Sequence, residues 1–537
     1  MVSTSSSHPA EADLPTTAVS VAIVGAGPVG LALALGLARH GVRSVLLEKN
    51  AGTSTTSKAA GLHVRTREVL AHWEVEERFL ERGVLEERLT MVSVKPNRPP
   101  LLHLDFSELA EEVDRPGLFL LEQSETEKLL LEAVRATGLC DVRFRSEVIG
   151  LEQDDSRVTL RVRQGVAEQR IEAEYVVGCD GAKSFVRGAL GMPFDGFTYS
   201  LRPMLADVRV HDERDALPQP RVWTGRGGYA FAARLRPGLW RLVHVPRGRP
   251  RDDEVSDEEV RERAHLLLGP GDVGVLWASR FRMHDRSAPR FRKGRVLLAG
   301  DAAHVHSPAS GYGMNGGIQD AHNLAWKLAH ALRGGDVERL LRSYEVERRA
   351  VVVEGTSRYT DRMTRLFIGA PPVVRDGAWL FLRMLMASPR LRRRGLRRFT
   401  MLDLSYPSSP LLDRRARAAG ERLPNPMLRT PDGQRMRLYS LLPSAPLILE
   451  IAEEEGPAVP IPIARLRIAP EHYRDPAGVL RRLLGDHDGW ILVRPDATIA
   501  WARRDLEGFE DALSHALGWS STRVEQEEAA VEGIGAR

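Results

Sequence analysis

The feature that most constrains the fold is the glycine-rich turn Gly25-Ala26-Gly27-Pro28-Val29-Gly30. It follows Val19 to Val24, an apolar run expected to form a strand, and precedes Leu31 to Arg39, whose pattern predicts a helix. Pro28 stands at the start of that helix, where its missing N–H costs nothing. Strand, turn and helix in this order predict the first unit of a dinucleotide-binding fold.

The glycines of this turn, and the acid after the next strand, indicate the ligand. Gly25 permits the tight turn, Gly27 admits a pyrophosphate, and Gly30 allows the helix to pack closely against the strand. Ser44 to Leu47 is the expected second strand, and Glu48 ends it. A carboxylate about 20 residues after the turn accepts hydroxyl groups from an adenosine ribose. We therefore predict an adenine dinucleotide site.

A second acid-and-glycine pattern lies in the stretch from Gly294 to Leu328. Arg295 to Gly300 is predicted to be a buried strand that ends at Asp301, where a carboxylate can bind hydroxyl groups. We expect a helix from Ile318 to Ala331, whose N-terminus would favour negative charge. The open loop expected between them contains Pro308, Gly311, Gly313, Asn315, Gly316 and Gly317.

A third strand with an acid at its end is predicted at Tyr175 to Gly178, followed by Cys179-Asp180-Gly181. Hairpin strands are expected between Asp141 and Ile171, around a turn at Asp154-Asp155-Ser156. Because these hairpins interrupt the pattern of alternating strands and helices, the sequence favours a split dinucleotide domain over a continuous Rossmann sheet.

Composition excludes several other classes. A chain of 537 residues is too long for one core, so two or three domains are expected. Cys140 and Cys179 form no CxxC motif, which excludes a disulfide scaffold and favours a reducing, cytoplasmic setting. The sequence carries no nucleic-acid recognition motif and no apolar run long enough to span a membrane.

The most basic run, Arg390 to Arg398, follows the apolar segment Ala378 to Met386. This pattern is compatible with an interfacial membrane helix. We favour a helix that covers the core and has a solvated basic end.

Three motifs together resemble those of a known family. GxGxxG with Glu48, CDGAKSFVR at 179–187, and GDAAH at 300–304 with the following GYGMN resemble the fingerprints of the single-component FAD-dependent aromatic hydroxylases, the p-hydroxybenzoate hydroxylase group. The resemblance covers residues 19 to about 520. The segment TSKAAGLHVRTREVL at 56–70 and the length are most similar to the phenol, chlorophenol and polyketide hydroxylases, which carry an extra C-terminal domain.

This resemblance implies an α/β fold: a GxGxxG FAD-binding Rossmann-like domain interleaved with a β-sheet substrate domain, plus a C-terminal thioredoxin-like α/β domain. The implied FAD-binding segments are about 19–90, 118–195 and 285–360, with the substrate sheet at about 91–117 and 196–284 and helices at about 361–405. A linker is expected at Tyr406 to Pro410, the thioredoxin-like domain at 411–520, and polar tails at 1–18 and 521–537. With no cysteine after Cys179, the last domain has no dithiol chemistry.

The resemblance also implies roles for individual residues. Arg65 and Gln123 would lie along FAD, Asp301 would bind its ribityl chain, and Asp180 with Arg187 would serve both FAD and the nicotinamide. Two departures stand out: Lys58 replaces a usual arginine, and Ser310 replaces a usual loop glycine. The implied cofactor-binding set is Gly25, Gly27, Pro28, Gly30, Glu48, Lys49, Lys58, Arg65, Gln123, Asp180, Asp301, Pro308, Gly311, Gly313, Met314 and Asn315.

Candidate catalytic residues are Arg241 and His244, in the second of two expected strands, Tyr229 to Leu235 and Leu239 to Val245. Strand parity places these two side chains on opposite faces, so at most one points toward substrate. Arg241 matches a position near the substrate in the phenol branch; a surface arginine and a packed histidine are the alternative. His304 and His306 alternate beside Asp301, and we expect loop hydrogen bonds there rather than a metal.

The sequence shows no nucleophile elbow and no second nucleotide fold, so a flavin must supply the chemistry and NADH or NADPH must bind transiently. The resemblance implies monooxygenation of a phenolic or polycyclic, polyketide-type aromatic with O2, through a C4a-hydroperoxyflavin. Two alternatives stay open: Baeyer–Villiger insertion on a polycyclic ketone, and a non-catalytic FAD-binding interaction protein. A halogenase is disfavoured because the GWxWxIP motif is absent. Monomer and homodimer are both compatible with the sequence.

Overall fold

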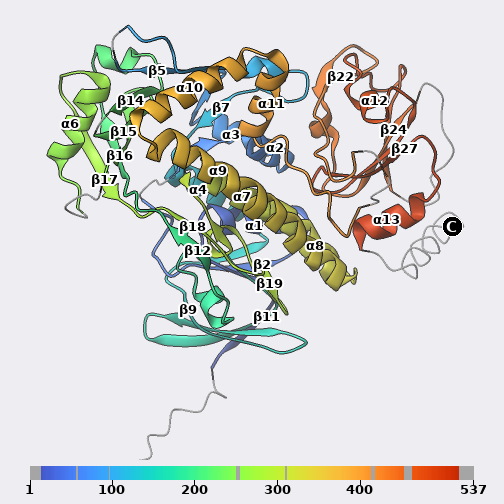
Figure 1. Cartoon of the computed structure of the whole chain (residues 1–537). Coiled ribbons are helices and arrows are strands. Elements are labelled where there is room, and N and C mark those ends of the chain that lie inside the picture. The colour runs from blue at the N-terminus through green and yellow to red at the C-terminus, as the bar shows by residue number, and fades with distance from the viewer. Residues whose placement is uncertain are drawn as a thin grey trace, which may run out of the picture.

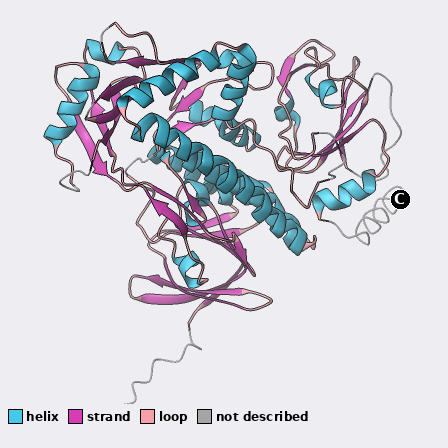
Figure 2. Cartoon of the chain, viewed as in Figure 1, coloured by secondary structure: helices cyan, strands magenta, loops and turns pink. Residues whose placement is uncertain are grey.

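The computed structural model describes residues 14–518, except 56–58, 96, 226, 249–253, 309–310, 413–415, 417 and 453–462. Lys58 and Ser310 therefore lie outside the described residues. Three regions are visible: a large α/β region crossed by two long helices, a second sheet above it, and a lobe at the C-terminal end of the chain (Figure 1). Figure 2 shows strands grouped into these sheets, with the two long helices lying between them.

The main sheet has five parallel strands at its centre, β20, β11, β1, β2 and β8, as the dinucleotide fold requires, and β19 pairs antiparallel with β20. Its strand order is β19-β20-β11-β1-β2-β8, and β9 and β10 extend it as antiparallel hairpins from β11. The strand β1 begins at Thr16, which pairs with Arg170, so the predicted tail to residue 18 is too long. The strands are β1 (Thr16–Val24), β2 (Ser44–Leu47), β8 (Cys140–Arg143), β9 (Glu147–Gln153), β10 (Val158–Gln164), β11 (Ala167–Gly178), β19 (Arg292–Lys293) and β20 (Val296–Leu298).

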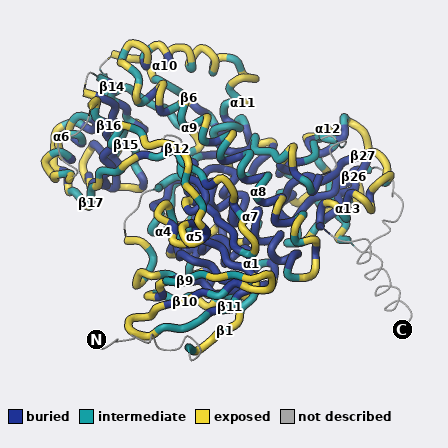
Figure 3. The backbone as a smooth tube through the Cα atoms, turned by 60° about the horizontal axis from the view of Figure 1, so that its bottom comes forward, coloured by how far each residue is buried: buried dark blue, intermediate teal, exposed yellow. Residues whose placement is uncertain are grey.

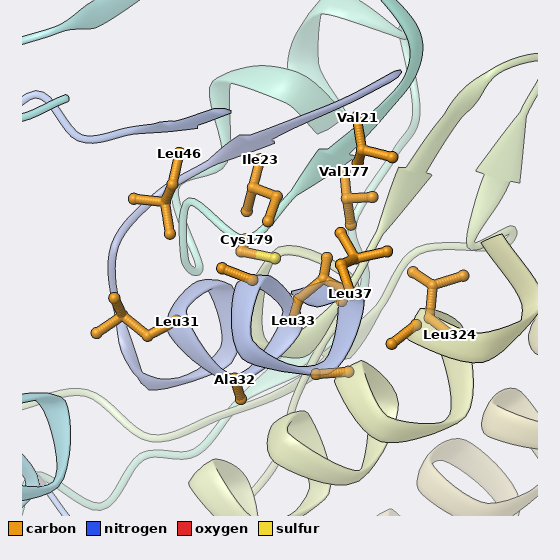
Figure 4. Packing of buried hydrophobic residues seen from close by; sticks show 14 of the residues in the cluster. Val21, Ile23, Leu31, Ala32, Leu33, Leu37, Leu46, Val177, Cys179 and Leu324 are labelled. Atoms are coloured by element: carbon orange, nitrogen blue, oxygen red, sulfur yellow. The ribbon is translucent and has the colours of Figure 1, made fainter. Parts of the chain in front are cut away.

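The core of this region forms where α1 (Pro28–Arg39) and α7 (Tyr312–Leu332) pack against the sheet. Figure 4 shows Leu33 and Leu37 of α1 beside Ile23 of the sheet, with Leu324 of α7 close by. Each of these side chains is fully buried, and burial of such a side chain contributes about 1.5–3 kcal/mol. The pair α1 and α7 therefore fixes the two loops that precede them.

The second sheet has the order β17-β13-β16-β15-β14-β5-β6, with α6 packed on its outer face. Both strands predicted around residues 229–245 are confirmed as β15 and β16. Its members are β5 (Arg88–Ser93), β6 (Leu102–Asp105), β13 (Met204–Arg209), β14 (Arg221–Gly225), β15 (Gly228–Arg236), β16 (Leu239–Pro246), β17 (Gly274–Arg280) and α6 (Asp257–Leu268).

Two small sheets connect these parts, β12-β18-β21 and β3-β7-β4. The sequence predicts a single helix from Val64 to Leu80, but Glu74 has a left-handed φ of 57°, and the segment forms two helices, α2 and α3. The elements are β3 (Gly61–Leu62), α2 (Val64–His72), α3 (Glu76–Leu80), β4 (Val84–Glu86), β7 (Leu118–Leu120), α4 (Gln123–Thr137), α5 (Phe185–Ala189), β12 (Asp195–Thr198), β18 (His284–Ser287) and β21 (His304–Val305).

Helices continue to Phe399, as predicted. They are α8 (Val337–Arg349), η6 (Ala350–Ser357), α9 (Arg358–Met363), η7 (Thr364–Gly369), α10 (Pro372–Met386) and α11 (Pro389–Phe399), of which η6 and η7 have π-helical geometry. Short 3-10 helices are η2 (Phe106–Leu109), η3 (Glu213–Ala216), η4 (Gly300–Ala302) and η8 (Leu438–Leu441). Within the described ranges, no helix combines the length and the hydropathy needed to cross a membrane.

The C-terminal lobe contains a four-stranded sheet of order β25-β24-β26-β27, in which β24 is parallel to β25 and antiparallel to β26. The sequence predicts strands at Leu447 to Ile451, Trp490 to Arg494 and Ile499 to Ala502, which are confirmed as β24, β26 and β27, and β25 is an additional strand. This mixed sheet, with α12 between β25 and β26 and α13 after β27, is an α/β domain, as the resemblance implies. Its elements are β22 (Met427–Arg429), β23 (Arg435–Arg437), β24 (Leu447–Ile451), β25 (Ala464–Ile468), α12 (Val479–Leu483), β26 (Gly489–Val493), β27 (Ile499–Arg503) and α13 (Phe509–Leu517).

Candidate cofactor and active site

The first glycine turn has the geometry that its sequence predicted. Gly25 has φ +106°, and a Cβ there would lie 2.6 Å from the carbonyl oxygen of Cys179. A Cβ on Gly30 would lie 1.9 Å from the carbonyl oxygen of Gly25, so only glycine allows α1 to start this close. A Cβ on Gly27 would meet no atom within 4 Å, and Pro28 is the first residue of α1. The turn thus leaves the space beside Gly27 open at the N-terminus of α1.

Glu48 lies directly across this turn. Its Oε2 accepts a hydrogen bond from the backbone N–H of Ala26 at 2.9 Å. Its Oε1 accepts the backbone N–H of Asn50 at 2.9 Å, and the side chain is half-buried. Lys49, by contrast, is exposed. A carboxylate held in this way keeps acceptor capacity for ribose hydroxyl groups beside the open space at Gly27.

Asp301 lies in the 3-10 turn η4 just after β20 and is exposed. Asp320 of α7 holds this turn in place. Its Oδ2 accepts a hydrogen bond from the backbone N–H of Gly300 at 3.0 Å, and the same oxygen contacts His304 Nε2 at 2.7 Å. Arg348 of α8 donates to the other oxygen of Asp320 at 2.6 Å. Burial raises the pKa of Asp320, but His304 and Arg348 outweigh burial and hold it at about 2. This ionised carboxylate therefore positions the turn that carries Asp301.

The predicted loop before Ile318 is mostly helix. The helix α7 starts at Tyr312, with Gly311 as its N-cap at φ +68°. A Cβ on Gly317 would lie 2.4 Å from Cγ2 of Val29 in α1. Glycine is therefore needed at this position for close packing of α7 against α1, and not for the flexibility of a loop. Gly313, Met314 and Asn315 accordingly form the first turn of α7, and the helix N-terminus lies about two turns earlier than predicted.

The individual residues of this turn have different environments. Asn315 is fully buried: its Oδ1 accepts the N–H of His63 at 2.8 Å and its Nδ2 donates to the carbonyl oxygen of Gly61 at 2.8 Å. The side chain of Met314 packs in the main core, so only its backbone can contact a ligand. Gly313 has open space at its Cβ position, and the carbonyl of the exposed Pro308 accepts the N–H of Gly311 at 3.0 Å.

The loop that carries Asp180 contacts both the Gly25 turn and the turn that carries Asp301. Asp180 Oδ2 accepts the N–H of Val186 at 3.1 Å, while its buried Oδ1 has no hydrogen-bond partner within the described ranges. Arg187 donates to the carbonyl oxygens of Ala302 and Ala182, each at 2.8 Å. Since Ala302 follows Asp301 and Cys179 contacts the Gly25 turn, the three sequence motifs meet at one edge of the sheet.

Arg65 lies in the first turn of α2 and contacts the C-terminal lobe. It is buried, and its guanidinium donates to Tyr439 Oη at 3.3 Å and to the carbonyl oxygen of Asp496 at 3.0 Å, both in the C-terminal lobe. These two contacts link α2 to the C-terminal lobe. Gln123 begins α4, and its Nε2 donates to Glu127 at 2.8 Å. Burial raises the pKa of Glu127.

The two candidate catalytic residues lie on opposite faces of β16, as strand parity predicted. His244 faces α6: burial, followed by the charges of Arg263 and Arg280, lowers its pKa to about 4. This environment is that of the packed histidine named as the alternative. Arg241 lies on the inner face and is buried in a bidentate ion pair with Asp207, with N–O distances of 2.8 and 2.9 Å.

The loop hydrogen bonds expected of His304 and His306 are not found among the described residues: neither ring nitrogen of His306 has a hydrogen-bond partner there, and His304 Nε2 contacts a helix residue. His304 contacts Asp320, and its ring stacks on His306 at 6.0 Å between centroids. Burial, followed by His304, lowers the pKa of His306 to about 3. Across the part of the chain that the structure describes, no group of three or more histidine, cysteine or acidic side chains could hold a metal ion.

Sequence reasoning missed the buried charges that connect the site to the C-terminal lobe. Glu347 of α8 accepts from Lys327 Nζ at 2.7 Å and from Arg494 Nη1 at 2.7 Å. Arg494 also pairs with Asp496, and all of these side chains except Asp496 are fully inaccessible. The available signal was the position of charged residues among the apolar positions of α7 and α8.

Comparisons with known proteins agree with this geometry. The family model for the FAD binding domain matches residues 18–358, and the model for the C-terminal domain of aromatic-ring hydroxylases matches residues 416–520. The chain belongs to the FAD-dependent aromatic-ring hydroxylases. It is an FAD-dependent monooxygenase, and members of this family take electrons from NADH or NADPH.

Relatives match along nearly the whole chain. YhjG, an uncharacterized aromatic compound monooxygenase of Bacillus subtilis, is 34% identical to this chain. The alignment covers 89% of this chain and 93% of YhjG. Pentachlorophenol 4-monooxygenase of Sphingobium chlorophenolicum is 31% identical to this chain, in an alignment that covers 91% of this chain and 95% of the relative. The solved structure of OxyS, an anhydrotetracycline hydroxylase of Streptomyces rimosus, superposes with a TM-score of 0.76 at 30% identity, covering 94% of this chain and 99% of its own.

We expect the substitution Asp301→Ala to weaken FAD retention in this hydroxylase. A polyol hydroxyl would lose a charge-assisted hydrogen bond of about 1.5–3 kcal/mol, which corresponds to about 10- to 100-fold in the dissociation constant. The measurement is FAD released on dilution, followed by fluorescence. Asp154→Ala, an exposed aspartate at a hairpin turn remote from the loops, is the matched control and should retain FAD like the parent. Equal retention by the Asp301 variant would exclude the anchoring role.

Proposed function

We propose that this enzyme hydroxylates a phenolic or polycyclic, polyketide-type aromatic compound with O2 and NADH or NADPH. The observation that carries the proposal is the full-length similarity to named aromatic monooxygenases, among them pentachlorophenol 4-monooxygenase and the anhydrotetracycline hydroxylase OxyS. When bound, FAD supplies the activation of oxygen, and the nicotinamide supplies the electrons.

The loops described above would hold the cofactor. The space at Gly27 would receive the diphosphate, Glu48 would accept the adenosine ribose hydroxyls, and Asp301 would accept those of the ribityl chain. The N-terminus of α7 would then favour negative charge on the ring, because its first backbone N–H groups have no partners within the helix.

The inner face of the second sheet would form the wall over the reacting ring. Its side chains are largely apolar, including Tyr229, Phe231, Val243 and Val245. Such a wall excludes water and accepts a flat aromatic ring. Arg241 also lies on this face, and its ion pair with Asp207 fixes the orientation of the guanidinium. We propose that it positions a substrate oxygen rather than transferring a proton, since arginine stays protonated.

The direct test is the rate of NADH or NADPH oxidation by the FAD-loaded enzyme with a panel of phenols and polycyclic aromatic polyketides. We expect at least one panel member to accelerate oxidation and to gain one oxygen atom. Formation of a ring-expanded lactone would select Baeyer–Villiger insertion instead. No acceleration by any member, with hydrogen peroxide as the sole product, would contradict the proposed substrate class.

A further inference from the structure

The helix α10 carries an apolar stripe on its outer side that nothing in the described chain covers. Its inner side is used for packing, since Trp379 lies 4.5 Å from Phe367 between ring centroids and Arg375 and Ala378 are buried. On the opposite side, large apolar residues are between 37% and 85% exposed. This α10 stripe consists of Val373, Val374, Leu380, Phe381, Met384 and Leu385.

The stripe is continuous and lies along one edge of the molecule. Its members recur at intervals of three, four and seven residues, so they share one helix face along four turns. Figure 3 shows α10 exposed along the outer edge, whereas α1 and α7 are buried in the interior. Leu391, in the first turn of α11, is 46% exposed and extends the apolar surface beyond the end of α10.

Positive charge borders this surface. Residues 371–398 contain eight arginines and a single acid, Asp376. Five of the eight donate to the protein: Arg375 to backbone carbonyls, and four on α11, Arg392, Arg393, Arg397 and Arg398, to carboxylates. The other three, Arg383, Arg390 and Arg394, are exposed and form no ion pair with any residue that the structure describes. They lie at the C-terminal end of α10 and on the exposed face of α11.

We propose that this surface docks the enzyme on an anionic lipid membrane, with the α10 stripe inserted at the level of the headgroups. An apolar helix face bordered by arginines is the pattern of an interfacial helix. Charge complementarity favours this occupant, because the exposed Arg383, Arg390 and Arg394 beside the stripe would face anionic headgroups, while Asp376 is the single acid in residues 371–398. The proposal revises the sequence-based preference for a core-covering helix with a solvated basic end: α10 covers the core with one face only.

The test is sedimentation of the FAD-loaded, full-length protein with vesicles of phosphatidylcholine containing phosphatidylglycerol. We expect binding to these vesicles and weak binding to pure phosphatidylcholine. The double variant L380S/F381S should lower the partition coefficient at least tenfold, because two inserted side chains are lost. The double variant R390Q/R394Q should lower it about tenfold or more, since each arginine near such a surface is worth about a factor of five.

Controls separate docking from unfolding and from self-association. Val166→Ser changes a fully exposed apolar residue on the β10–β11 hairpin and should bind vesicles like the parent. All variants should keep parental FAD content. Equal binding of L380S/F381S and the parent to anionic vesicles would overturn the proposal. It would also be overturned if light scattering showed a dimer that L380S/F381S converts to a monomer, because the stripe would then be a contact between two copies.

Discussion

The substitution Glu347→Ala is expected to lower the free energy of unfolding by about 3–5 kcal/mol, a large part of the 5–15 kcal/mol typical of a folded protein. Glu347 is fully buried between Lys327 of α7 and Arg494 of the C-terminal lobe. Removing its carboxylate leaves two buried cations without that partner. Urea unfolding followed by fluorescence measures the change, and FAD should be lost at lower urea than in the parent.

The matched control is Glu338→Ala on the same helix. Glu338 pairs with Arg292 but is 80% exposed, so its loss should cost at most about 1 kcal/mol. If both alanine variants unfolded at the same urea concentration, the buried network would not be holding the C-terminal lobe to α7 and α8.

The same network predicts how stability depends on acid. Burial raises the pKa of Glu347, but Arg494 and Lys327 outweigh it and hold the pKa at about 2, below the usual 4.5. Between these values the unfolded chain binds a proton that the folded chain does not, so this contribution is present above about pH 4.5 and is lost as the pH falls toward 2. The variant Glu347→Gln should show a shallower loss of stability over this range.

The second large effect is expected at Gly30. In Gly30→Ala, the new Cβ would lie 1.9 Å from the carbonyl oxygen of Gly25, so the turn and α1 must move apart. We expect loss of FAD binding together with a destabilisation of about 1–3 kcal/mol or more, the range of overpacked cores. Absorbance of bound flavin and thermal unfolding report the two consequences.

Two other glycines provide the comparison. Gly27→Ala introduces a Cβ that meets no protein atom within 4 Å, so it should fold normally and lose FAD affinity only because the methyl group occupies the diphosphate space. Gly377→Ala, inside α10 and equally open, should be neutral or stabilise by about 0.5–1 kcal/mol. Parental FAD affinity in Gly27→Ala would mean that the diphosphate does not approach this turn.

The sequence predicted the parts of the fold that depend on local patterns. The unit from β1 to Glu48 was recognised because strand, glycine turn, helix and acid are contiguous, and each has a sterically defined role. The face of Arg241 followed from strand parity alone. Local patterns also suffice for the three predicted strands of the C-terminal lobe.

What was missed depends on contacts between distant segments. The glycines at 313–317 resemble a loop in sequence, but Gly317 is required by the close approach of Val29, nearly 290 positions earlier. The partner of Arg65 at Asp496 lies 431 residues further along the chain. His244 could be assigned to a face, but which face is covered by α6 is decided only by the assembled sheet. In each case the sequence defines the local geometry but not the neighbour.

The central claim is that this enzyme hydroxylates an aromatic ring with one oxygen atom from O2, and isotope labelling tests this claim most directly. With FAD-loaded enzyme, NADPH or NADH, ¹⁸O2 and a substrate found by accelerated nicotinamide oxidation, mass spectrometry should show one ¹⁸O atom in the product, on the ring. In H2¹⁸O under unlabelled O2, the product should contain no label. Product oxygen derived from water would contradict the account.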